Sequence, residues 1–119
     1  MTCDPASFVL LLGHLSFAGE RVEQLLIQAI ANRNLIEFWY EGHQRIAEPH
    51  ILGESGGVMQ LLGYQVRGTS SSGSIPEWRR VDLHKMSLLK VLPEGFGGRR
   101  PAPSGRHSGW DRVIVIVAD

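Results

Sequence analysis

The spacing of apolar residues changes within residues 20–40, which read ERVEQLLIQAIANRNLIEFWY. In residues 20–34 the apolar side chains recur every three or four positions, which predicts an amphipathic helix. Its apolar face holds Val22, Leu25, Leu26, Ala29 and Ile30. Residues 35–40 are apolar and aromatic, which favours a β-strand. We expect the helix to pack on a sheet, because a membrane-surface helix would carry more Lys and Arg on its polar face.

Downstream of this stretch, short strand-like segments alternate with turns. Strands are predicted over residues 35–40, 44–48, 58–67, 77–83, 87–91 and 111–117. Glycine-containing turns at 41–42 and 54–57 join consecutive strands, and the Ser- and Gly-rich stretch 68–74 is typical of a loop. One N-terminal helix followed by five or six short antiparallel strands predicts a mainly β, α+β fold in the form of a small β-barrel.

Alternation along the predicted strands assigns side chains to faces. Within residues 58–67, one face is expected to hold Val58, Gln60, Leu62, Tyr64 and Val66, and the other face the residues between them. Neighbouring residues of a strand point to opposite faces, so the adjacent Arg79 and Arg80 are not expected to line one pocket together. We expect one of them to be a structural partner of Asp82 or Glu48.

The composition places the chain among small folded domains. Its 119 residues and 43% hydrophobic content are typical of one globular domain. The formal net charge of zero argues against a protein that coats polyanions through a large positive excess. The single cysteine, Cys3, excludes an internal disulfide framework and a zinc site built on cysteine pairs. Ten of the twelve basic residues are arginines, which suit bidentate recognition of phosphate or carboxylate.

The charges are distributed unevenly along the chain. Residues 1–42 contain two basic and five acidic residues, whereas residues 43–106 contain nine basic and five acidic residues. A solvated mixed surface and a ligand site explain this pattern equally well, so both interpretations stay open. Arg99, Arg100 and Arg106 fall in a predicted loop, where we expect them to be solvated, with a nucleic-acid clamp as the alternative.

The chain divides into four predicted segments. Residues 1–19 are expected to be an apolar arm that packs on the domain or on a second copy, because the apolar run 8–17 is too short to span a bilayer and no signal-peptide pattern surrounds it. Residues 20–92 form the helix and barrel, and residues 93–109 form a Gly-, Pro- and Arg-rich loop. Residues 110–119 supply a strand that completes the domain or a dimer interface.

The apolar run at 113–117 would aggregate if its edge stayed exposed, which favours a homodimer that covers it. We expect a cytoplasmic protein with no membrane partner.

Catalytic motifs are missing: His43 and His50 flank Glu48 at no recognised metal spacing, and the serines at 70–72 lie in a loop without a fixed base. No P-loop, dinucleotide-binding glycine motif or nucleophile elbow occurs. The sequence predicts a protein that is not an enzyme and uses no cofactor or metal.

Four stretches together resemble the WYL-domain family. They are AIANRNLIEFWY at 29–40, RIAEP at 45–49, LLGY at 61–64 and WRRVDLHKM at 78–86, in the order and spacing of the family, and the resemblance covers about residues 20–96. Met59 and Gln60 stand where the family's naming motif has Trp and Tyr. The chain is similar to a stand-alone WYL protein, without the winged-helix DNA-binding domain that usually precedes a WYL domain.

This resemblance implies an SH3-like or Sm-like small barrel with a ligand-sensing, regulatory role, as in bacterial transcription regulators and accessory proteins of phage-defence systems. The implied ligand is single-stranded nucleic acid or a nucleotide-like anion, and the implied protein partner is a separate DNA-binding or defence-system protein. The ligand-binding residues expected from the family's motif are Arg45, Tyr64, Arg79, Arg80 and Lys85. Trp39 and Trp78 are further candidates for stacking a base.

Each expected site residue also has a structural interpretation. Trp39, Tyr40 and Tyr64 fit a role as core aromatics, and Arg45 fits a cross-strand ion pair with Glu37 or Glu77. The alternative function is a protein–protein interaction or oligomerisation module that binds no nucleic acid.

Overall fold

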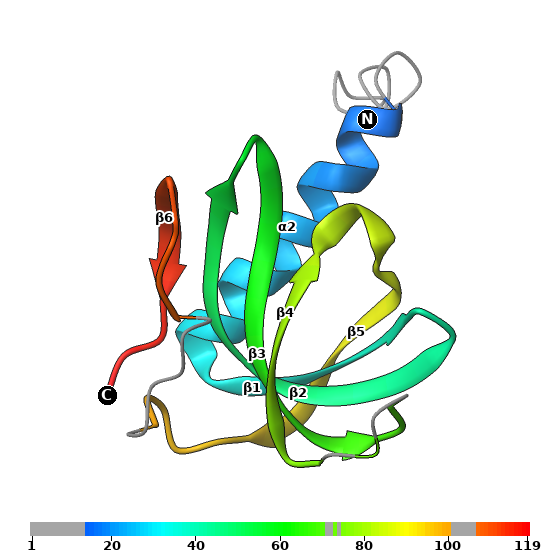
Figure 1. Ribbon diagram of the computed structural model, residues 1–119, viewed down its shortest axis with the longest axis vertical. Helices are drawn as coiled ribbons and strands as arrows, with labels where there is room; N and C mark the ends of the chain where they lie inside the picture. Colours follow the sequence, from blue (N-terminus) through cyan, green and yellow to red (C-terminus); the bar gives the residue numbers. More distant parts are fainter. Residues whose placement is uncertain (1–13, 71–72, 74, 101–106) are drawn as a thin grey trace, which may run out of the picture.

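The computed structural model describes residues 14–70, 73, 75–100 and 107–119. A helix and six strands make up the described fold, with the helix lying across one face of a curved sheet (Figure 1). In chain order the elements are α2 (His14–Asn32), β1 (Asn34–Tyr40), β2 (His43–Ser55), β3 (Val58–Gly68), β4 (Glu77–Asp82), the 3-10 helix η1 (Leu83–Lys85), β5 (Ser87–Gly95) and β6 (Arg112–Ile116). The predicted mainly β, α+β class with one N-terminal helix is confirmed.

Helix α2 begins earlier than the sequence indicated. It starts at His14 and includes Gly19, which we had placed before the helix. A single helical glycine is tolerated because it lowers stability by only about 1 kcal/mol relative to alanine. The helix ends at Asn32, and Arg33 adopts a left-handed backbone conformation with a φ of 56° before β1 starts. Residues 14–19 of the predicted arm are therefore helical, and the rest of that arm lies outside the described residues.

The strands form one antiparallel sheet in the order β4-β3-β2-β1-β5, with β6 added beside β2. β2 is the central strand: one edge pairs with β3, and the other pairs first with β1 over residues 43–47 and then with β6 over residues 51–54. The sheet is open, because its path ends at β4 and β5 and no described residues pair these two strands. The described pairings do not close the sheet into a barrel.

β2 is longer than the predicted 44–48 and runs to Ser55. The predicted strand ends before Pro49, and proline has no N–H to donate to a neighbouring strand. In the structure the register of β2 and β3 shifts between Pro49 and Ile51, and such an irregularity accommodates a missing donor. β5 also runs further than predicted, to Gly95, so the expected loop 93–109 begins with strand residues.

Helix α2 covers one face of the sheet, which we call the inner face; the opposite face is the outer face. The inner core joins Leu26, Ala29 and Ile30 of the helix to strand residues that include Ile36, Phe38, Ala47, Leu52, Leu61 and Val81. A smaller cluster on the outer face contains Ile51, Leu62 and Trp78, with Tyr64 and Trp110 packed against it. Leu61 and Leu62 thus lie on opposite faces, which confirms the predicted alternation along β3.

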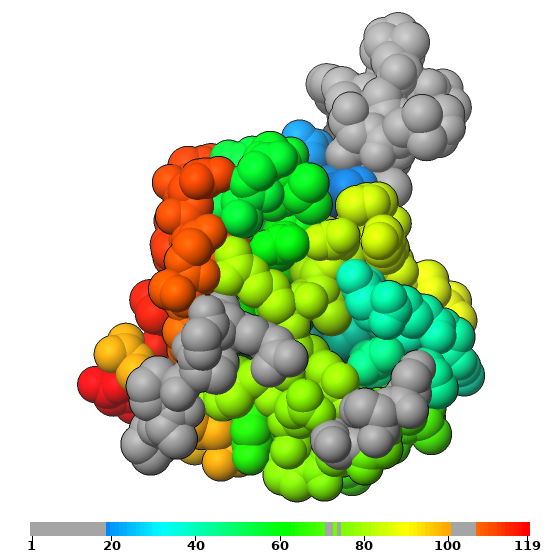
Figure 2. Space-filling view, viewed as in Figure 1, coloured from blue at the N-terminus to red at the C-terminus, as the bar shows by residue number. Residues whose placement is uncertain are grey.

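The C-terminal segment returns to the sheet as β6. In Figure 2 it lies, orange to red, along the edge of the green hairpin formed by β2 and β3. Val117 is buried, whereas Val113 and Ile116 are 47% and 49% exposed. The predicted strand 111–117 therefore adds to the sheet of its own chain. Within the described ranges, no helix combines the length and apolar content needed to cross a membrane.

Candidate anion-binding site

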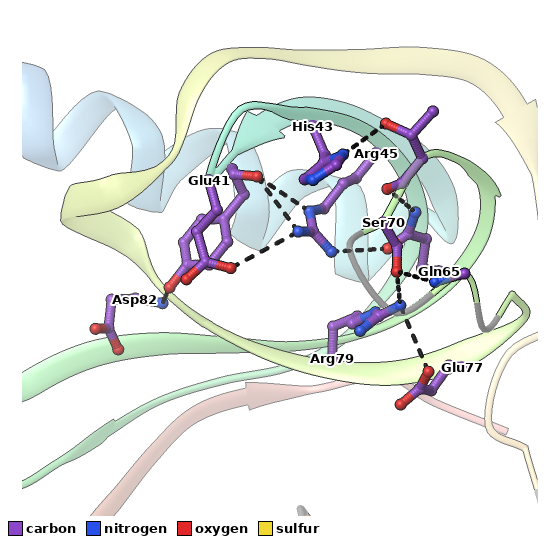
Figure 3. A network of polar contacts seen from close by, with 11 residues as sticks. Glu41, His43, Arg45, Gln65, Ser70, Glu77, Arg79 and Asp82 are labelled. Atoms are coloured by element: carbon purple, nitrogen blue, oxygen red, sulfur yellow. Dashed lines mark hydrogen bonds and ion pairs between the residues drawn. The ribbon is translucent and has the colours of Figure 1, made fainter.

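Five polar side chains gather on the inner face where β2, β3 and β4 lie side by side (Figure 3). We call them the inner polar cluster: Arg45, Gln65, Ser70, Glu77 and Arg79. Strand register explains how they meet, because Gln65 of β3 stands opposite Ala47 of β2 and opposite Glu77 of β4. Residues two positions apart share a face, so Arg45 and Arg79 join the same side of the sheet.

Arg45 is a buried cation, with 4% of its surface exposed. Its Nε and Nη2 atoms donate to the carbonyl oxygen of Tyr40 at 3.4 and 3.3 Å, and its Nη1 donates to Gln65 Oε1 at 3.1 Å. The carboxylate that pairs with it, Glu41, lies 3.8 Å away on a side chain that is 65% exposed. Burial lowers the pKa of Arg45, and the positive charge of Arg79 lowers it further. The oxygens that accept the hydrogen bonds of Arg45, from Tyr40 and Gln65, are both uncharged.

This pairing corrects the expected cross-strand partners of Arg45, which were Glu37 and Glu77. Glu37 instead accepts a hydrogen bond from Gln44 Nε2 and lies 4.0 Å from the ammonium of Lys90. The reason is geometric. Arg45 stands opposite Phe38 on the inner face, so the neighbouring Glu37 points to the other side of β1.

Gln65 orients Arg45. Its side chain is fully buried, and its Nε2 donates to the carbonyl oxygens of Arg67 and Thr69 at 3.1 and 3.0 Å. These two bonds leave the amide oxygen to accept from Arg45. No motif points to this role, but one sequence signal does: Gln65 is a polar residue on the same strand face as the apolar Leu61.

Arg79 brings a second guanidinium to the cluster from β4. Its Nη2 donates to Ser70 Oγ at 2.8 Å and lies 3.4 Å from Glu77 Oε1. The charge of Arg79 lowers the pKa of Arg45, so the two cations interact through space. The inner face therefore holds two guanidinium groups, each of which has a described carboxylate within 4 Å, Glu41 for Arg45 and Glu77 for Arg79. Guanidinium groups are the donors that suit an oxyanion.

Arg80 lies on the outer face, so the two adjacent arginines point apart as predicted. Its Nε donates to Gln60 Oε1 at 2.8 Å, and its Nη1 donates to the carbonyl oxygen of Ser108 at 2.6 Å. The guanidinium also lies 3.6 Å from the centre of the Trp110 ring. Through Ser108 and Trp110, Arg80 therefore links β4 to the segment that precedes β6. Among the described residues, Arg79 contacts Ser70 and Glu77, and Arg80 donates to Gln60, Ser108 and Gly109. These contacts correct the expected pairing with Asp82 or Glu48.

The other predicted site residues lie away from the inner polar cluster. Tyr64 and Trp78 share the outer face, with 4.9 Å between their ring centroids, and Trp78 is buried. Trp39 on β1 is partly exposed, and Lys85 in η1 lies 3.8 Å from the carboxylate of Asp82. Of the predicted ligand-binding residues, the described inner face therefore brings together Arg45 and Arg79.

Arg100 lies in the expected loop with its side chain 42% exposed, and it is also paired with a buried carboxylate. Its Nε and Nη2 each donate to a carboxylate oxygen of Glu48 at 2.7 Å, and its guanidinium lies 4.3 Å from the centre of the Tyr64 ring. The hydrogen bonds to Glu48 raise the pKa of Arg100. Arg99 is also paired, at 3.3 Å from the carboxylate of Asp119. The third expected loop arginine, Arg106, lies outside the described residues.

The two histidines that flank Glu48 in the sequence have separate surroundings. His43 Nδ1 lies 3.1 Å from Thr69 Oγ1, whereas His50 Nε2 lies 3.0 Å from Glu48 Oε1 on the buried side of β2. In the part of the chain that the structure describes, no three potential ligands are grouped so that they could hold a metal ion.

Fold and cluster together define an α+β domain whose open antiparallel sheet carries two arginines on its helix-covered face. Comparisons of the chain with protein-family models, with curated proteins and with solved structures find no match.

Proposed function

We propose that this protein is a non-enzymatic sensor or regulatory domain that binds single-stranded nucleic acid, or a nucleotide-like anion, at the inner polar cluster. The observation that carries this proposal is the juxtaposition of Arg45 and Arg79 on one face, with Arg45 buried against neutral acceptors. The proposal includes membership of the WYL family and a barrel of the SH3-like or Sm-like type. Both rest on the sequence motifs.

Phosphate is the anion that suits this pair of cations. A planar guanidinium donates two parallel hydrogen bonds to a phosphate, and the attraction is screened less at a buried position than at the surface. The partner of Arg45, Glu41, is largely exposed, and ion pairs of that kind contribute little to stability. A ligand phosphate can therefore replace Glu41 at small energetic cost.

Fluorescence anisotropy of short single-stranded DNA and RNA, at low and moderate salt, tests this proposal. Arg79→Ala is expected to weaken binding about tenfold or more, and to reduce the slope of log affinity against log salt by about one. Arg79→Lys keeps the charge but loses the two-pronged donor, so its affinity should fall between those of the wild type and Arg79→Ala.

Arg67→Ala is the matched control, because Arg67 is an exposed β3 arginine that pairs with Glu94 at 2.7 Å, outside the inner polar cluster. It should bind like the wild type. A flat titration for every oligonucleotide at low salt would exclude nucleic acid as the ligand. Equal loss in Arg67→Ala and Arg79→Ala would show that the inner polar cluster is not the site.

The second candidate function is an oligomerisation or protein-interaction module, and β6 favours it. One edge of β6 pairs with β2, no described strand pairs with its other edge, and Val113 and Ile116 are about half exposed. Such an edge is a template for pairing with a second copy of the chain. A homodimer joined at β6 would leave the inner polar cluster available to a ligand, since that cluster is built from β2, β3, β4 and Ser70 in the loop after β3.

A further inference from the structure

A broad groove lies beside the first half of α2, between the helix, the tip of the β2–β3 hairpin and η1 (Figure 1). It has a volume of about 650 Å³, and we call it the helix groove. Its main lining residues are Val22, Glu23, Val58, Met59, Leu83 and Met86. None of these belongs to the inner polar cluster, so the helix groove is a separate feature of the molecule.

The helix groove is apolar and continuous with the inner core. Leu83 and Met86 are buried members of that core, and the half-buried Val22 and Met59 pack against it. The polar residue Glu23 lies at the edge of these apolar side chains, on α2. A contiguous apolar surface with a polar rim marks an interaction site. The flexible side chains of the two methionines suit such a site, because they adapt to the shape of an apolar partner.

The chain itself contains an apolar segment close to this groove in the sequence. Residues 8–12 read FVLLL, five consecutive apolar residues without a charge, and we call them the apolar run. The run ends two residues before α2 begins at His14, and it lies outside the described residues. Exposure of five such side chains to water is unfavourable, so the run favours contact with an apolar surface.

The length of chain between the run and the groove allows them to meet. Val22 lies eight residues after His14 in α2, which is about 12 Å along a helix axis. Phe8 lies six residues before His14, and six extended residues span up to about 20 Å. The run can therefore turn back beside α2 and reach Val22.

The same short connection favours the groove of the same chain over that of a second copy. A short tether gives its two ends an effective concentration in the millimolar range. A second copy at micromolar concentration competes poorly with a segment that is already attached.

We propose that the apolar run binds in the helix groove of its own chain and covers Val22, Met59 and Met86. The occupant is thus an apolar segment of the protein, and the polar side chain of Glu23 stays at the rim in water. This proposal does not rest on the proposed function, because neither the run nor the groove shares a residue with the inner polar cluster.

Paramagnetic NMR of the full chain tests the contact directly. Cys3 is the single cysteine and lies five residues before Phe8, so a nitroxide can be attached there without a substitution. The chain has three methionines, and two of them, Met59 and Met86, line the groove. The nitroxide should broaden the ¹³C-methyl signals of both groove methionines, and chemical reduction of the nitroxide should restore them. Signals that stay sharp in the labelled chain would overturn the proposal.

A mixed sample identifies the chain that supplies the run. In it, one copy carries the nitroxide without ¹³C, and the other carries ¹³C-methionine without the nitroxide. Binding within one chain predicts sharp signals of Met59 and Met86 in this mixture at micromolar concentration. Broadening as strong as in the doubly labelled chain would show that the run binds a second copy, and the proposal would be wrong.

Variants of the run provide the matched comparison. Leu10→Asp places a charge within the run and should reduce the broadening of Met59 and Met86 several-fold, because a carboxylate opposes burial in an apolar groove. Ser7→Asp adds the same charge just outside the run and should leave the broadening unchanged. Equal broadening in the two variants would show that something other than the run holds the label near the groove.

Variants of the groove test the other side of the contact. Val58→Asp, at the hairpin tip, should also reduce the broadening. Leu88→Asp is its control, because Leu88 is an exposed β5 residue outside the lining of the groove. Circular dichroism of each variant checks that the fold is retained. A loss of broadening in Leu88→Asp equal to that in Val58→Asp would contradict the helix groove as the binding site.

Discussion

At the scale of single residues, β2 buries two opposite charges in different ways. Arg45 on the inner face is hydrogen-bonded by neutral oxygens, and its pKa is lowered by burial and by Arg79. The Glu48 carboxylate accepts two hydrogen bonds from the guanidinium of Arg100 and contacts the ring nitrogen of His50. A charge without close neutralisation is available to a ligand, whereas a neutralised charge stabilises the fold. Under the proposed function, Arg45 serves recognition, whereas the closely paired Glu48 stabilises the fold.

The pH dependence of stability should reflect Glu48. Burial raises the pKa of its carboxyl, but the hydrogen bonds from Arg100 and His50 outweigh burial and hold the pKa below the ordinary value of 4.5. Because the unfolded chain takes up this proton more readily, the stabilisation is complete above about pH 5 and is lost as the pH falls through the folded-state pKa. Urea denaturation at a series of pH values should show this loss in the wild type and not in Glu48→Gln.

Glu94→Gln is the control for this experiment, because it removes an exposed carboxylate that pairs with Arg67. It should keep the wild-type pH profile. A Glu48→Gln variant whose stability still fell in parallel with the wild type below about pH 5 would show that Glu48 is not the titrating group.

At the scale of elements, β6 depends on a close approach to β2 at Gly53. A Cβ atom at Gly53 would lie 2.6 Å from the carbonyl oxygen of Arg112 and 2.7 Å from the Trp110 ring. Gly53→Ala should therefore displace β6 and lower the free energy of unfolding by about 1–3 kcal/mol. Hydrogen exchange should show loss of protection at the β6 amides before the amides of β3.

Gly19→Ala provides the matched substitution in open space, since no described heavy atom outside its own helix backbone and chain neighbours lies within 4 Å of a Cβ built there. It should leave β6 protected and stabilise α2 by about 0.5–1 kcal/mol. Unchanged protection of β6 in Gly53→Ala would mean that the segment packs without this contact.

The elements also show where local patterns are reliable. The period of apolar residues identified α2 and every described strand, because burial on one face dictates the spacing of apolar side chains. The predicted helix end at residue 34 is wrong, because α2 ends at Asn32 and Asn34 begins β1. The other errors lie at Gly19, at Pro49 and at residues 93–95, where residues that disfavour regular structure are nevertheless part of an element. Packing of the neighbouring strands outweighs such local preferences, and the spacing of apolar residues does not reveal it.

At the scale of the whole molecule, the sheet carries the inner polar cluster on its helix-covered face and leaves β6 at an edge. If β6 pairs with a second copy, sedimentation at micromolar concentration should give a dimer for the wild type and a monomer for Val113→Lys. A charge on this exposed apolar edge opposes pairing between strands. Leu88→Lys, which changes an exposed leucine on β5, should stay dimeric. A monomeric wild type would contradict the oligomerisation function.

The sequence by itself determined the presence of the helix and of each described strand, and the alternation of faces along β3, because these depend on side-chain periodicity within a few residues. It also separated Arg79 from Arg80 for the same reason. Only the tertiary structure decided the partners: Gln65 for Arg45, Ser108 for Arg80, and Glu48 for Arg100 across 52 residues. Such contacts depend on strand register and on how the C-terminal segment returns to the sheet. Those are long-range packing outcomes that local spacing does not encode.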